Sequence, residues 1–169
     1  MKKTANHISQ RETIDDILEV KTLAVLQSVT GGSCALVDPD DGLISPTPIT
    51  AFVELATDDA RLLTGLLLDV KSWFFASKRC LPRATAVIDL NSHAGDAKLM
   101  IGMPCEGWDL RVGHDRAGGF FDPVANQVRG ILKRTFPEIA STGARSMWKA
   151  GAIAKLKQDA LARQDVAEP

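Results

Sequence analysis

The sequence predicts an α+β protein in which helices pack against an antiparallel β-sheet. Two patterns predict this class: apolar residues recur with a helical period at 12–29 and 58–78, and three β-type runs fall within 84–112. Composition agrees, because 45% of the 169 residues are hydrophobic and 24% are charged, as in an ordinary globular domain with its own core. No apolar run reaches the ~18 residues that a membrane span needs, so we expect no span.

The first element is expected to be a helix at 12–29. Gly31 and Gly32 follow it, and glycine is typical of the residue that ends a helix. A short β-type run at 33–37 then predicts the first strand.

A β-hairpin is predicted after this strand. Residues 38–42 read Asp-Pro-Asp-Asp-Gly, which is a strong turn signal. The return strand is expected to begin at 43–45. Pro46 and Pro48 interrupt it, because proline cannot donate a hydrogen bond to a strand ladder.

The second helix is expected at 58–78, after acidic residues that suit its first turn. A surface helix has one apolar stripe about a third of a turn wide, but here apolar residues cover more than half of the circumference. One stripe is formed by Leu62, Leu66, Val70, Trp73 and Phe74. One side can pack on the sheet, and the remaining apolar surface indicates contact with another protein.

Three β-type runs, at 84–90, 97–103 and 108–112, are separated by turn-rich segments and predict an antiparallel meander. Asp122 and Pro123 then begin a helix that extends to about 136. The predicted order is α-β-β-α-β-β-β-α.

The chain is expected to form one domain at 1–140, followed by a basic helix and tail at 141–169. The last helix is expected at 144–163. Residues 123–169 hold 8 Lys and Arg against 4 Asp and Glu, whereas residues 1–122 are acidic, with 12 against 17. Such a basic segment suits either an acidic partner or a solvated helix face.

The three cysteines, Cys34, Cys80 and Cys105, are odd in number and far apart. We therefore expect buried free thiols and neither a disulfide framework nor a zinc site. The N-terminal lysines are followed by polar residues where a signal peptide would be apolar. The expected location is cytoplasmic.

The sequence nominates no catalytic, cofactor or metal site. His7, His93 and His114 lack metal-binding spacing, and the common nucleophile and phosphate-loop motifs do not occur. The expectation is therefore a protein that is not an enzyme and has no cofactor.

Several of these features together resemble the Roadblock/LC7 family, whose members adopt a longin-like α-β-β-α-β-β-β-α sandwich. The likeness lies in the glycine–strand–Asp/Gly turn segment at 29–44, the Leu-rich helix at 58–78, and the meander at 84–112 that leads into a helix at 122. The segment at 144–163 is then an extra C-terminal helix.

In that family the central helix and the first strand of the meander form a homodimer with a continuous sheet. The resemblance therefore implies a dimer interface in this chain. It comprises Leu62, Leu66, Val70, Trp73, Phe74, Thr85, Val87 and Asp89.

Bacterial members of the family regulate or scaffold small Ras-like GTPases, and some use a C-terminal helix for this contact. The resemblance implies a non-enzymatic homodimeric scaffold or regulator of such a GTPase. The expected partner-binding residues are Arg145, Trp148, Lys149, Lys155 and Lys157. Two alternatives are a secretion-type chaperone of similar element order and an accessory protein that binds nucleic acid through 144–163. A small enzyme is a third.

Overall fold

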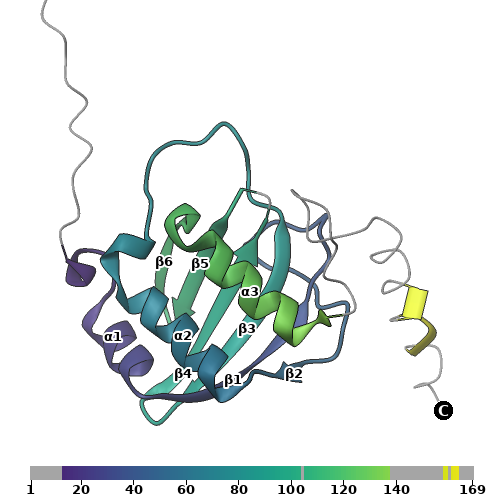
Figure 1. Ribbon diagram of the computed structural model, residues 1–169, viewed down its shortest axis with the longest axis horizontal. Coiled ribbons are helices and arrows are strands. Elements are labelled where there is room, and N and C mark those ends of the chain that lie inside the picture. Colours follow the sequence, from purple (N-terminus) through teal and green to yellow (C-terminus); the bar gives the residue numbers. More distant parts are fainter. Residues whose placement is uncertain (1–12, 104, 138–157, 160, 164–169) are drawn as a thin grey trace, which may run out of the picture.

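A six-stranded antiparallel sheet, in the order β2-β1-β3-β4-β5-β6, is the centre of the fold. The computed structural model describes residues 13–103, 105–137, 158–159 and 161–163. The strands are β1 (Val29–Leu36), β2 (Val53–Glu54), β3 (Ala84–Ser92), β4 (Gly95–Gly102), β5 (Gly107–Val112) and β6 (Asp115–Phe120). The α-helices of this part of the chain are α1 (Val20–Gln27), α2 (Thr57–Leu68) and α3 (Ala125–Thr135), and all three lie on the same face of the sheet (Figure 1). The α+β class is therefore confirmed.

The first helix is shorter than predicted, and the two glycines after it have another role. A 3-10 turn at Ile14–Asp16 precedes α1, and Gly31 and Gly32 lie inside β1 rather than at a helix end. A Cβ atom on Gly32 would lie 2.6 Å from the backbone oxygen of Asp89. Glycine is needed here because β1 and β3 approach closely.

The predicted turn after β1 forms, but the predicted return strand does not. The Asp41 amide donates to the Asp38 carbonyl (3.0 Å). The chain then crosses in a loop, with one isolated bridge between Val37 and Pro48, and the return strand is β2, further along at Val53–Glu54. The prolines explain the delay, since a ladder through 46–48 would lack its donors.

Helix α2 ends at Leu68, ten residues before the predicted end at 78. The Trp73 indole donates to the carbonyl of Leu67 (3.1 Å), near the end of the helix, and its ring lies 4.8 Å from that of Trp108, centroid to centroid. Phe74 pairs with Phe120 at the end of β6. The predicted apolar stripe is therefore divided between a helix and an extended segment.

The meander has four strands instead of three. The polar segment after β5 forms β6, which follows a tight turn at Gly113, where φ is +58°. Strand β3 lies between β1 and β4 and is hydrogen-bonded to both. It therefore offers no free edge, contrary to the expectation that this strand continues the sheet into a second subunit.

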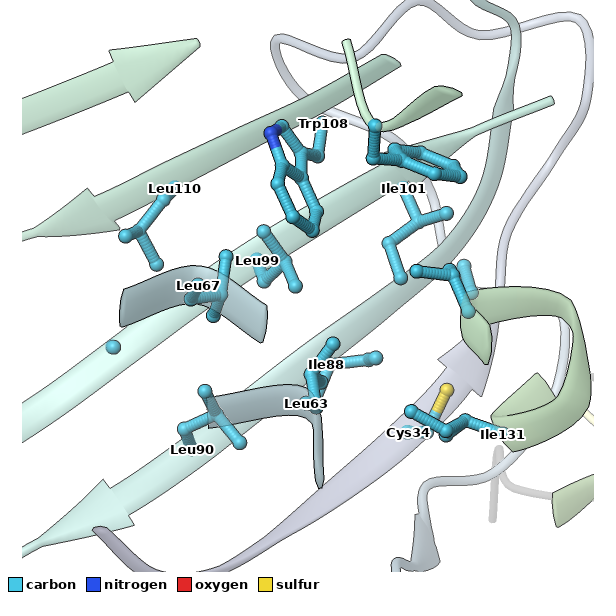
Figure 2. Packing of buried hydrophobic residues seen from close by; sticks show 14 of the residues in the cluster. Cys34, Leu63, Leu67, Ile88, Leu90, Leu99, Ile101, Trp108, Leu110 and Ile131 are labelled. Carbon is cyan, nitrogen blue, oxygen red and sulfur yellow. The ribbon is translucent and has the colours of Figure 1, made fainter. Parts of the chain in front are cut away.

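The main core lies between the sheet and the three helices (Figure 2). Leu63 and Leu67 of α2 point onto the inward side chains of the central strands, and Ile131 of α3 lies near Cys34 of β1. These inward side chains include Ile88, Leu90, Leu99, Ile101, Trp108 and Leu110, all with an exposure of 1% or less. Burial of each such Leu or Ile contributes roughly 1.5–3 kcal/mol.

The connector between α2 and β3 is fastened to the sheet. Cys80 and Cys105 form a disulfide, with their Cα atoms 6.1 Å apart, so the expectation of free thiols was wrong for these two residues. Lys78 Nζ donates to Asp122 Oδ1 (2.6 Å) and to the Cys105 carbonyl (3.0 Å). The two cysteines are far apart in sequence, and they meet because the connector packs against the β4–β5 turn.

Within the described residues, the helices are all too short or too polar to cross a membrane. A disulfide is typical of oxidising compartments. The cytoplasmic location therefore stays a prediction, as does the domain boundary at 140, which lies outside the described residues.

Candidate interaction surface on the open face of the sheet

The sheet face turned away from α1, α2 and α3, here called the open face, carries an ordered row of charges. Side chains alternate along each strand, so Asp89, Lys98 and Arg111 point away from the core that their neighbours Ile88, Leu99 and Leu110 enter. Cross-strand partners bring one residue from each strand into line. This charged row consists of Glu54, Ser33, Asp89, Lys98, Arg111 and Arg116, in order from β2 to β6.

The charged row is polarised. Its charges on β2 and β3 are negative, and those on β4, β5 and β6 are positive. Where the two halves meet, Lys98 Nζ lies 3.5 Å from Asp89 Oδ1, and these side chains are 54% and 35% exposed. Such an exposed pair adds little to stability, and both groups are accessible to a partner.

Two arginines of the row are held by one buried carboxylate. Asp109 is 2% exposed and lies next to the row on the open face. It accepts hydrogen bonds from Arg116 Nε (2.9 and 3.0 Å) and from Arg111 Nη2 (3.2 Å). The hydrogen bonds to Asp109 raise the pKa of Arg116. One carboxylate therefore orients two cations, which leaves an excess of positive charge at this end of the row.

One end of the open face is apolar and is covered by the loop 38–52. Beneath the loop lies a second, smaller core, in which Leu43 packs on buried strand residues: Ala35, Val37, Ala84, Val87 and Met100. The outer side of the loop exposes Ile44 and Phe52, at 66% and 43%. Exposed apolar residues thus border the charged row.

Two hollows lie along the charged row, and the first of them is where the apolar loop meets the row. The first measures about 440 Å³ and is lined by loop residues, including Ile44 and Phe52, and by Val87 and Met100 of the sheet. The second measures about 420 Å³ and extends toward Asp96 and Gly113. Asp89, Lys98 and Arg111 line both hollows. The surface therefore combines hollows, apolar side chains and charges of both signs, as protein interfaces do.

The expected dimer residues do not form one surface. Leu62 and Phe74 are exposed, whereas Trp73, Thr85 and Val87 are buried within the single chain. Leu66 and Val70 are half-buried. Val87 and Asp89 point to the open face, on the other side of the sheet from α2. An interface that joins α2 to these β3 side chains therefore does not fit this fold.

The expected partner-binding residues Arg145, Trp148, Lys149, Lys155 and Lys157 lie outside the described residues. The structure instead nominates Lys98, Arg111 and Arg116, which the sequence reasoning missed. Strand alternation over 97–112 is the signal that could have found the first two, since it separates Leu99 and Leu110 from their charged neighbours.

In the described part of the chain, Cys34, His93 and His114 lie apart from one another. Burial raises the pKa of the Cys34 thiol to about 12, so this group stays protonated near neutral pH. His93 and His114 are exposed in separate turns. Among the described residues, no three His, Cys, Asp or Glu side chains are grouped as metal ligands.

Comparison with known proteins gives no match to a family model, a curated protein or a solved structure. A functional proposal for this chain therefore has to come from the geometry of its surface.

Proposed function

We propose that this protein is a non-enzymatic protein-binding module whose partner docks on the open face of its sheet. The observation that carries the proposal is the polarised charged row next to the exposed side chains of Ile44 and Phe52. Apolar groups supply the burial that drives association, and charges of both signs supply orientation and specificity.

Restraint of the arginines supports the proposal. Immobilising a flexible side chain at an interface costs roughly 0.5–1.5 kcal/mol of conformational free energy. Asp109 already orients Arg111 and Arg116 in the free chain, so less of this cost remains when they contact a partner. Arginine is also among the residues that most often contribute strongly to interfaces.

Photocrosslinking in the native cell tests the proposal. A photoreactive amino acid is placed at Ile44, and a matched one at Arg61, which is exposed on α2 at the other side of the sheet. The proposal predicts a discrete protein adduct from position 44 that position 61 does not give. Equal labelling from both positions, or adducts from position 61 alone, would contradict it.

A small Ras-like GTPase is the partner class that the Roadblock/LC7 resemblance suggests, and it remains a proposal. The support is the α+β element order up to β3. The central position of β3 and the additional strand β6 distinguish this sheet from the one that the resemblance implied. Titration calorimetry with a purified GTPase encoded beside this gene, in its GDP and GTP-analogue forms, is the test; the absence of binding heat in both forms would refute this partner.

The two other partner classes depend on segments with less structural support. Nucleic-acid binding would rely on 144–163, of which only residues 158–159 and 161–163 are described. On the open face, Glu54 and Asp89 would repel phosphate groups. A secretion-type chaperone remains compatible with an apolar docking surface, and the same crosslinking would reveal its secreted client.

A further inference from the structure

We infer that the open face binds a second copy of this chain. This inference rests on the proposed function and names the partner. The charged row is self-complementary. Its acidic half covers three strands, with Glu54 on β2, the neutral Ser33 on β1 and Asp89 on β3, and its basic half covers the other three, β4, β5 and β6.

Symmetry decides how two such rows can meet. When two open faces stack, a two-fold axis parallel to the strands and between β3 and β4 reverses the row of the second copy. Asp89 then faces the basic half of the other chain, and Glu54 faces its far end, near Arg116. An axis along the row would instead place like charges together, which costs several kcal/mol in an interface. The favourable pairing is isologous, as in most closed dimers.

The apolar border fits the same arrangement. Ile44 and Phe52 stand beside the first hollow, whose floor includes Val87 and Met100. In a symmetric pair each copy supplies one such loop and one such hollow, so exposed apolar groups of both chains lose contact with water.

A second copy fits both halves of the row better than a partner of one charge. A uniformly acidic partner would meet Glu54 and Asp89, and a uniformly basic one would meet three cations. A copy of this chain satisfies both halves at once and needs no separate gene product.

Two complementary variants test the inference. Glu54→Lys combined with Asp89→Lys makes the row cationic, and Lys98→Glu combined with Arg111→Gln makes it largely acidic. Arg116 stays in place so that buried Asp109 keeps a partner. Light scattering after size exclusion is used to follow dissociation with dilution. We expect the wild type to be a dimer, each variant alone to dissociate at least about 100-fold more readily, and their equimolar mixture to form a heterodimer.

Matched controls separate this inference from folding and from the proposed function. Arg61→Glu and Lys133→Glu change charge on exposed residues of α2 and α3 and should leave the dimer intact. Every variant must unfold cooperatively and, at concentrations low enough for the wild type to be monomeric, at the same temperature as the wild type. A monomeric wild type, or a dimer that the row variants do not weaken, would overturn the inference. In either case, photocrosslinking of a different protein at Ile44 would still uphold the proposed function.

Discussion

The two faces of the sheet differ sharply, although they alternate along the same strands. Leu99 is fully buried beneath the helices, while Lys98, one residue earlier, is 54% exposed in the charged row. The inward face is apolar from β1 to β5 and is sealed by α1, α2 and α3. The outward face combines a small apolar core, a covering loop and paired charges. The inward face therefore accounts for stability, and the outward face is available for recognition.

The largest expected effect lies on the covered face. Leu99→Ala removes a fully buried side chain from the centre of the sheet, so we expect the free energy of unfolding to fall by about 2–5 kcal/mol. Urea denaturation measures this loss. A change below about 1 kcal/mol would show that the helices do not seal this face as described.

The disulfide is expected to have the next largest effect. The bond closes a loop across a separation of 25 residues, and restriction of the unfolded chain by such a loop contributes about 3 kcal/mol. Cys80→Ser should lower the free energy of unfolding by about this amount. A reductant should destabilise the wild type similarly and the variant no further; a reductant effect on the variant would contradict this assignment.

Asp109 is buried on the open face, where it holds two arginines of the charged row. Asp109→Asn removes the charge that holds Arg111 and Arg116. We expect a loss of about 1–2 kcal/mol, moderated because both arginines are partly exposed to water. Chemical denaturation checks it, with exposed Asp96→Asn as a control. Equal effects of the two substitutions would show that Asp109 has no special role.

The smallest effect on folding is expected within the charged row. Lys98→Ala removes only an exposed ion pair with Asp89, so its effect on the free energy of monomer unfolding should stay within about 0.5 kcal/mol. The same change should weaken self-association. Parallel measurements of unfolding and of dimer dissociation separate these effects. A large loss of monomer stability would contradict the claim that the charged row contributes little to folding.

The sequence predicted the elements whose signals are local. Helical periodicity located α3, and β-type runs between turn-rich segments located β3, β4 and β5. Gly118 and Gly119 concealed β6, because glycine is depleted in strands. Pairing with β5 and the Phe74–Phe120 bridge hold this strand in place. Gly32 was predicted to follow the end of a helix, but it lies in β1, where only glycine fits the close contact with β3.

The candidate site depended on pairing that no local pattern contains. Asp89, Lys98 and Arg111 are far apart in sequence and become neighbours only through the register of three strands. The apolar residues at 58–78 do not lie on one helix as predicted, because α2 ends at Leu68. Trp73 packs in the core at the end of α2, and Leu62 is exposed. The disulfide likewise depended on the position of the connector, which packs beside the turn that contains Cys105.

The central claim is that association uses the open face and not the helical face. Backbone amide NMR spectra, recorded from dilute to concentrated wild-type protein, test it most directly. We predict concentration-dependent shifts at Ser33, Asp89, Lys98 and Arg111, and at Ile44 in the loop, with little change in α2 and α3. Shifts centred on Leu62 and the exposed side of α2, with an unchanged charged row, would contradict the account.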